Sequence, residues 1–514
     1  MQEMNKSKTP NDKPAAARRM VRTSLDILPE GTPELLAEQL TQKKAQRGTL
    51  PEGIDSKMLY GDVMRIAWPS LVELLLSSLV SMVDMMMVGG LGTWAISAVG
   101  LATQPRFLFM NLVMAVNVGA TAMVARARGA GDHAQANKIL KQSMFLSLIM
   151  AIIGTVAGYI FSEPMIRFMA NSGMSEQVIY HGTKYLEIQM LGFGFSALTM
   201  TITAALRGTG NSKTAMVYNL VANLVNVVFN YLFINGNFGF PRLEVAGASL
   251  ATIIGQAVAF FMAMYSVMNG KNYLKLELRG RFVPDRDVIK GISQVGLPAL
   301  GEQLIMRVGM IIFGRTVATL GEIDMATHQV CMNIQSISFM NGQAFAVSAT
   351  SLLGQSLGKK RPDMAEHYSS RCRRLGMSVS LFMAVLFAIF GSTIVGFYNR
   401  DAEVLRMGAM IMLFVAGIQP IQSSQFVLSG ALRGAGDTRV TAVITLITVL
   451  IIRPVIAELG INVFNWGLIG AWVAIVLDQC VRSALVLARY NSRKWMTIKI
   501  AGVSSREETE SVEA

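Results

Sequence analysis

Apolar residues dominate the chain between about positions 60 and 490, where short polar loops separate them into long segments. Many segments reach the roughly 20 residues that a helix needs to cross a bilayer. We predict twelve membrane-spanning helices, with boundaries good to about two to four residues. The first six spans are predicted at 62–88, 95–125, 139–162, 178–205, 214–234 and 245–268. The second six are predicted at 288–319, 325–356, 372–398, 404–431, 440–460 and 467–489.

Composition agrees with a membrane protein. Hydrophobic residues make up 52% of the 514 positions and charged residues only 15%, whereas about 25% is typical of soluble chains. The net charge of +13 would favour nucleic-acid binding in a soluble protein. Here the basic residues lie in loops between spans, so we expect no nucleic-acid partner. The three Cys and four His are scattered, and their spacing predicts neither a disulfide nor a metal site.

Basic residues follow the even-numbered spans. The loop after the eighth span contains Lys359, Lys360 and Arg361, whereas the loop at 89–94 has no Lys or Arg and that at 320–324 has none either. The positive-inside rule therefore predicts that both termini are cytoplasmic. We expect the protein to lie in the plasma membrane.

The two ends of the chain differ from the rest in composition. Residues 1–60 mix acidic and basic residues with several prolines and contain no apolar core typical of a signal peptide. We expect a solvated cytoplasmic tail there, with a regulatory domain as the alternative. Residues 491–514 are expected to form a second solvated tail.

The second half of the sequence repeats the first at an offset of 223 to 229 positions. The matched pairs include Pro69 with Pro298, Glu73 with Glu302, and the Ala-Leu-Arg-Gly runs at 205–208 and 431–434. An even number of spans in each half makes the repeats parallel, with a substrate site expected at their interface. We predict an all-α fold in which an N-lobe (61–270) and a C-lobe (291–490) are joined by a cytoplasmic linker (271–290).

Four amides line one face of the fifth span. Asn219, Asn223, Asn226 and Asn230 follow each other at i, i+4, i+7 and i+11, which places them in one stripe along a helix. Polar side chains at bilayer depth indicate function by default. We interpret the stripe as a cavity lining, and hydrogen bonding between helices is the alternative.

The first span contains two acidic residues. Glu73 and Asp84 are 11 positions apart, so they lie within about 20° of each other around the helix. Glu73 is predicted to face a cavity or to pair with a basic residue such as Arg65. Asp84, without a permanent partner, could exchange a proton or hold a sodium ion together with the asparagine carbonyls.

The second half keeps only part of this pattern. Glu302 repeats Glu73, but Phe313 stands where Asp84 would recur. Arg307 and Arg453 could bind an anionic substrate group. Alternatively, these two arginines could be neutralised by pairing with Glu302 and Asp478. The cavity residues expected from this half are Glu302, Arg307 and Gln422.

Motifs that would point to an enzyme are weak. The run Gly208–Thr214 lacks the spacing of a phosphate-binding loop, and its counterpart at 434–439 indicates a tight turn between helices. We therefore expect neither an enzyme nor a bound cofactor.

Several motifs together resemble the multidrug and toxic compound extrusion (MATE) family over about residues 60–490. They are Val83–Gly89 in the first span, Ala125–Asp132 after the second, the Leu-Arg-Gly-x-Gly turns after the fourth and tenth, and Asn226–Ile234. The resemblance implies twelve helices in two lobes that form a V-shaped cavity. It also implies export of organic, often cationic, small molecules in exchange for protons or sodium ions. We expect the protein to be a monomer.

The resemblance also implies roles for particular residues. Asp84 matches the aspartate of the family's N-lobe cation site, Asn226 matches an asparagine of that cluster, and Asn230 stands where many members have an aspartate. The acidic pair of the sodium-coupled branch falls on Met306 and Gln422, so that C-lobe site is expected to be absent. The cation-coupling residues are therefore predicted to be Asp84, Asn223, Asn226 and Asn230.

The expected mechanism is alternating access. Substrate enters between the lobes from the cytoplasm, and a cation binding at Asp84 from outside repacks the first span and expels it. No ATP-binding domain is visible, so active transport would draw on an ion gradient. The alternatives are a lipid-linked oligosaccharide flippase, an exporter of an anionic metabolite, a membrane-embedded enzyme and a scaffold that transports nothing.

Overall fold

A computed structural model describes residues 23–41, 49–170, 174–277, 283–398 and 401–503, and these residues form helices without any strand. The N-lobe comprises α2 (Ser56–Gly89), α3 (Thr93–Gly129), α4 (His133–Ile160), α5 (Ser162–Met169), α6 (Glu176–Leu191), α7 (Phe193–Gly208), α8 (Ser212–Asn235) and α9 (Glu244–Met268). The C-lobe comprises α10 (Arg286–Ala318), α11 (Glu322–Gly358), α12 (Pro362–Gly396), α13 (Ala402–Gly434), α14 (Thr438–Leu446), α15 (Arg453–Glu458) and α16 (Gly467–Asn491). Short helices at Pro33–Thr41 (α1), Ser24–Ile27 and Lys494–Thr497 lie near the chain ends.

The helices correspond to the twelve predicted spans, six in each lobe, and the all-α two-lobed fold is confirmed. In the described residues, ten helices are long and apolar enough to cross a membrane, and an eleventh span is counted when α6 and α7 are taken together. The remaining span is α11, which carries many polar residues, and some of them are buried. Its buried polar residues include Gln335, Asn341, Ser348, Ser351 and Gln355. These side chains face other helices rather than lipid.

Two spans are less regular than the sequence predicts. The fourth is broken into α6 and α7, which meet at an angle of 51°. Gly192 lies at the break, and a Cβ atom there would overlap the Ile253 side chain of α9. The eleventh span runs from Thr438 to Val463 and contains π-helical turns at Ile447–Ile452 and Leu459–Val463.

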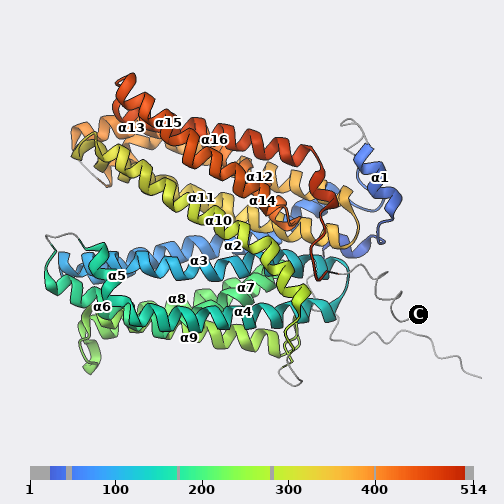
Figure 1. Ribbon diagram of the computed structural model, residues 1–514, viewed down its shortest axis with the longest axis horizontal. Coiled ribbons are helices and arrows are strands. Elements are labelled where there is room, and N and C mark those ends of the chain that lie inside the picture. The colour runs from blue at the N-terminus through green and yellow to red at the C-terminus, as the bar shows by residue number, and fades with distance from the viewer. Residues whose placement is uncertain (1–22, 42–48, 171–173, 278–282, 399–400, 504–514) are drawn as a thin grey trace, which may run out of the picture.

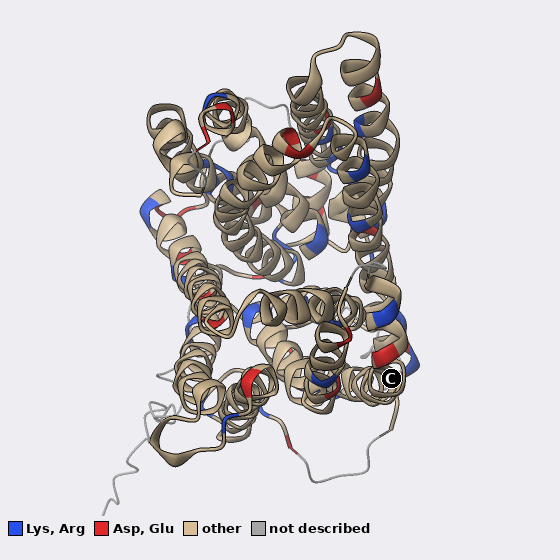
Figure 2. Ribbon diagram, turned by 90° about the vertical axis from the view of Figure 1, so that its left-hand side faces the viewer, with Lys and Arg blue, Asp and Glu red and all other residues tan. Residues whose placement is uncertain are grey.

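The two lobes form a V (Figure 1). Seen from its open end, the lobes are separate groups of helices, one above the other (Figure 2). At the closed end α3 packs against α10 and α11, and α2 packs against α11. Gly129 and Gly358 allow this approach, because a Cβ atom on either would overlap backbone of the opposite lobe at Gln355 or Arg126.

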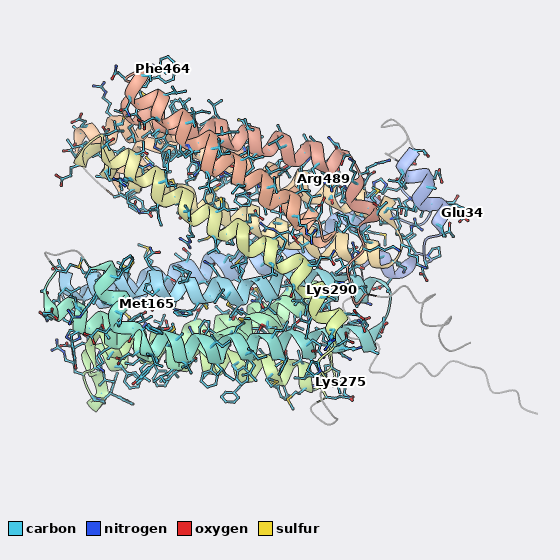
Figure 3. The ribbon with its side chains drawn as sticks, in the orientation of Figure 1. Glu34, Met165, Lys275, Lys290, Phe464 and Arg489 are labelled. Carbon is cyan, nitrogen blue, oxygen red and sulfur yellow. The ribbon has the colours of Figure 1, made fainter. Side chains whose placement is uncertain are left out.

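Charged residues from several segments lie toward the closed end. Glu34, Lys275, Lys290 and Arg489 lie toward it, whereas Met165 and Phe464 lie at the open end (Figure 3). The basic loops that follow the even-numbered spans therefore gather where the lobes meet.

Described residues within both of the segments expected as solvated tails, at 1–60 and 491–514, pack against the closed end. Leu25 is 2% exposed and Trp495 is fully buried. Arg126 of α3 donates to the Ile498 carbonyl at 3.0 Å. The first helix of the N-lobe, α2, starts at Ser56. Residues 1–22, 42–48 and 504–514 of the expected tails, and 278–282 of the expected linker, lie outside the described residues.

Candidate functional site

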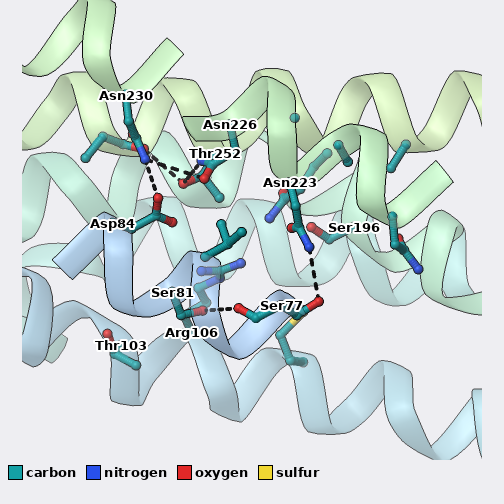
Figure 4. A pocket seen from close by; sticks show the side chains of 18 of the residues that line it. Ser77, Ser81, Asp84, Thr103, Arg106, Ser196, Asn223, Asn226, Asn230 and Thr252 are labelled. Carbon is teal, nitrogen blue, oxygen red and sulfur yellow. Dashed lines mark hydrogen bonds between the residues drawn. The ribbon is translucent and has the colours of Figure 1, made fainter. Parts of the chain in front are cut away.

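A cavity of about 570 Å³ lies inside the N-lobe (Figure 4). Its walls come from α2, α3, α6, α7, α8 and α9. Every residue that lines it belongs to the N-lobe, so this cavity differs from the expected site between the two halves. The sequence predicts that Asp84 and the four asparagines belong to the first half alone, and the cavity lies in that half.

Asp84 lies at one end of the cavity, next to Asn226 and Asn230 (Figure 4). Asn230 of α8 donates from Nδ2 to Asp84 Oδ1 at 2.6 Å. With the Asn226 amide turned so that its nitrogen faces α2, Asn226 donates to both Asp84 oxygens at 3.0 Å, and its oxygen accepts from Thr252 of α9. Asp84 makes no ion pair within the described residues, so two neutral amides are the groups that hold its carboxylate.

The four asparagines of α8 all line this cavity. Because the four side chains share one face of α8, they reach partners on one neighbouring helix, α2. Asn219 donates to Glu73 Oε1 at 2.7 Å, and Asn223 donates to Ser77 Oγ at 3.2 Å. The Oδ1 atom of Asn230 is buried without a hydrogen-bond partner. It is therefore an oxygen available to a cation near Asp84.

Glu73 lines the other end of the cavity but is held by a basic residue. Arg207 of α7 donates to Glu73 Oε1 at 2.8 Å. Pairing with Arg65, the alternative considered from sequence, does not occur: Arg65 lies 3.9 Å from Asp62. Arg207 is 134 positions from Glu73 in the chain, so the pair forms only when the helices pack together.

The C-lobe contains the same pair at the repeated positions. Arg433 of α13 donates to Glu302 Oε1 at 2.9 Å, and Thr441 donates to Glu302 Oε2 at 3.3 Å. Glu302 is 6% exposed and does not line the N-lobe cavity. The two glutamate–arginine pairs are thus a shared feature of the repeat.

The other charged residues predicted in the C-lobe are also placed outside this cavity. Arg453 and Arg482 both bond Asp478, with Arg453 Nε at 3.1 Å and Arg482 Nη2 at 2.6 Å from its Oδ2. Arg307 does not pair with Glu302. Its guanidinium instead lies over the Phe107 ring of the N-lobe, 5.2 Å from the centroid.

Gln422 is 2% exposed and its Nε2 atom has no hydrogen-bond partner. Met306, the other C-lobe position considered, lies 3.5 Å from Arg482 Nη1 through its sulfur. Neither residue is among those lining the N-lobe cavity.

Sequence reasoning missed several residues of the N-lobe cavity. Arg106 of α3 lines it together with Thr252, Ser196 and Tyr185. Arg106 could have been noticed, because it is the basic residue inside the apolar run 95–125. The hydroxyl residues carry no such signal, since Ser and Thr occur throughout membrane helices.

Two parallel six-helix lobes with a polar cavity at membrane depth define a membrane transporter. The family model MatE matches residues 69–232 and 298–458, one segment in each lobe and together more than half of the chain. The chain therefore belongs to the multidrug and toxic compound extrusion (MATE) family. Members of this family are membrane transporters of small molecules rather than enzymes.

Curated relatives are similar over almost their full length. A protein described as probable multidrug resistance protein NorM from Thermotoga maritima is 27% identical over 441 residues, which is 84% of this chain and 92% of the relative. Multidrug resistance protein PmpM from Pseudomonas aeruginosa is 27% identical over 462 residues, covering 86% of this chain and 94% of the relative.

Solved structures share the fold. A MATE in the bent conformation superposes with a TM-score of 0.78 at 22% identity, covering 87% of this chain and 99% of that one. A MATE family transporter in an outward-facing conformation gives a TM-score of 0.79 at 22% identity, covering 88% of this chain and all of the other. A transporter from Pyrococcus furiosus, titled for the reverse polarity of its binding pocket, gives a TM-score of 0.78 at 21% identity, covering 86% of this chain and 97% of that one.

Proposed function

We propose that this protein exports organic compounds in exchange for a cation, a proton or a sodium ion, that binds at Asp84 in the N-lobe cavity. The observation that carries the proposal is the carboxylate of Asp84, which lies in the cavity and is held by amides rather than by a basic partner. Ionisable groups at membrane depth mark substrate and ion pathways. The similarity to proteins named as multidrug resistance proteins supports compound export.

The cavity is suited to hold a drug-sized molecule. Its 570 Å³ falls within the roughly 300–1,000 Å³ of small-molecule sites. Met85, Met110 and Met200 contribute to its walls, and methionine side chains adapt to varied apolar surfaces. A cation at Asp84 and a substrate would occupy one cavity, so each would weaken binding of the other. Competition of this kind is what exchange requires.

Oxygen atoms around Asp84 could serve either ion. A proton needs only the carboxylate, whereas sodium is bound by several oxygens, including carbonyls. Asn230 Oδ1 has no partner, whereas the Asn226 nitrogen faces Asp84 and its oxygen faces Thr252. Thr252 lies beside Asn226. The coupling ion must therefore be determined by measurement.

The basic end of the molecule is proposed to face the cytoplasm, following the positive-inside rule. Both ends of the described chain lie there (Figure 1), so both termini would be cytoplasmic. The open side of the V would then face outward, and this structure would represent the outward-facing state.

Efflux from proteoliposomes under separate gradients tests the exchange. A fluorescent organic cation is loaded, and either a proton gradient or a sodium gradient is imposed at zero membrane potential. We expect one of the two gradients to drive efflux against the substrate gradient. Efflux that responds to neither would contradict the proposal.

Export of an anionic compound is a second candidate. Arg106 lines the cavity and forms no ion pair in the part of the chain that the structure describes. Arg307 lies over Phe107, another lining residue. Replacing Arg106 by Gln should abolish transport of an anionic dye if this candidate is right, and should leave transport of a cationic dye intact. A wild-type protein that transports only the cationic dye, with that transport intact in Arg106→Gln, would favour the cation exporter.

A further inference from the structure

The segment Thr23–Gly31, termed the strap, contacts both lobes at the closed end. On the N-lobe side, Ser24 donates to Asp62 Oδ2 of α2 from its backbone nitrogen at 2.7 Å and from its hydroxyl at 2.6 Å. Tyr368 of α12, in the C-lobe, donates to the same oxygen at 2.9 Å. One buried carboxylate oxygen thus joins the strap, the N-lobe and the C-lobe.

Ionic and backbone contacts extend this bridge. Asp26 pairs with Arg128 at the end of α3, in the N-lobe, at 3.1 Å. The C-lobe is reached through the turn after α11, where the Lys359 ammonium donates to the Leu25 carbonyl. The Gly31 nitrogen donates to the Lys359 carbonyl at 3.1 Å. Arg128 and Lys359 belong to opposite lobes, so the strap spans the line along which the lobes meet.

Apolar burial anchors the strap between the lobes. Leu25 is 2% exposed and Leu28 7%, whereas Ile27 between them is 65% exposed. Leu25 and Leu28 belong to a cluster that includes Val63 of α2 and Leu352 of α11. Because this cluster joins residues of both lobes, separation of the lobes would break part of its packing.

We propose that the strap is a latch, which holds the lobes together at the basic end and so stabilises the state in which the V opens at the opposite end. Opening of the basic end would carry α2 and α3 away from α11 and α12, and the strap would have to leave one lobe. The strap precedes both segments that the family model matches. The inference goes beyond cation exchange and requires only that the lobes rock against each other.

Spin labels at the open end provide the test. Phe168 follows α4 in α5, and Phe397 directly follows α12; both are highly exposed, at 89% and 83%. Both are replaced by Cys in full-length protein whose three native cysteines are replaced by Ala, and the distance distribution between the labels is measured in lipid nanodiscs. Closing of the open end shortens this distance.

Leu25→Asp is expected to expel the strap, since a charge cannot occupy its buried position. The ratio of short-distance to long-distance populations should rise on the order of tenfold, as expected for the loss of one buried leucine anchor. Ile27→Asp, a matched control on the exposed face of the strap, should leave the distribution unchanged.

A milder change is available if Leu25→Asp does not fold. Asp26→Lys faces Arg128 with a like charge and should move the distribution in the same direction by less. The double variant Asp26→Lys/Arg128→Asp should move it back. A folded Leu25→Asp variant with the distribution of the parent protein would overturn the proposal. If Leu25→Asp does not fold, a folded Asp26→Lys variant with the distance distribution of the parent protein would overturn the proposal.

Discussion

At the scale of single residues, the two glutamate–arginine pairs are a structural device that the repeat places once in each lobe. Glu73 and Glu302 are 9% and 6% exposed, and each accepts from an arginine near the end of the fourth span of its lobe. A buried ion pair contributes little net stability when complete, but removing one partner leaves the other charge buried and uncompensated.

Glu302→Gln is therefore expected to lower the stability of the protein by about 3 kcal/mol, because Arg433 is left without its carboxylate. Thermal unfolding in detergent measures the effect. The double variant Glu302→Gln/Arg433→Gln should recover much of the loss. Glu163→Gln is the control: its pair with Arg167 is about half exposed on both sides and should be worth about 1 kcal/mol at most. Equal losses from Glu302→Gln and Glu163→Gln would contradict this account.

Helical periodicity sets how far single residues can be placed from the sequence. The spacing of the four asparagines placed them on one face, and the structure places all four in one cavity with Asp84. Periodicity says nothing about partners on other helices. The pairing of Glu73 with Arg207 instead of Arg65, and the presence of Arg106 in the cavity, depend on how distant spans pack.

At the scale of elements, the break between α6 and α7 allows α9 to pack closely. The Ile253 side chain of α9 occupies the space that a Cβ atom at Gly192 would need. Gly192→Ala should destabilise the protein by about 1–3 kcal/mol through overpacking, and Ile253→Ala should relieve the overlap in the double variant. Thermal unfolding again provides the measurement.

Gly194 supplies the matched control for this prediction. It lies two residues further on in α7, and a Cβ atom there would meet nothing within 4 Å. Gly194→Ala should be neutral or slightly stabilising, because alanine favours a helix over glycine. A loss of stability at Gly194 equal to that at Gly192 would show that the break itself, rather than contact with Ile253, decides the effect.

The apolar pattern predicted the existence of these elements better than their irregularities. Twelve segments were assigned from hydropathy, including α11, whose polar residues are buried against other helices. The bend at Gly192 and the π-helical turns of the eleventh span could not be foreseen, since they follow from contacts with neighbouring helices. The strap was also missed, because its few apolar residues are surrounded by a polar sequence.

At the scale of the whole molecule, close backbone contact between the lobes defines the closed end. Gly358 of α11 lies directly against the backbone at Arg126 of α3. Gly358→Ala should prevent full closure and shift the labels at Phe168 and Phe397 toward shorter distances. Gly314→Ala, where an added Cβ meets nothing within 4 Å, should leave the distances as they are. Unchanged distances in a folded Gly358→Ala protein would contradict this role for the contact.

The symmetry of the molecule is partial, and that asymmetry bears on function. The ion pairs and the lobe architecture repeat, whereas the C-lobe has Phe313 in place of Asp84 and an Arg453–Asp478–Arg482 cluster of its own. Cation coupling is accordingly expected to depend on the N-lobe alone.

The central claim is that Asp84 couples cation binding to compound export, and one comparison tests it most directly. Wild-type protein and Asp84→Asn are reconstituted at equal density, and efflux of the same organic cation is followed under the gradient that drives the wild type. Asparagine preserves the size of the side chain, so the variant should fold and still bind the compound. We predict that Asp84→Asn loses gradient-driven efflux. Efflux at the wild-type rate and with the wild-type dependence on the gradient would contradict the account.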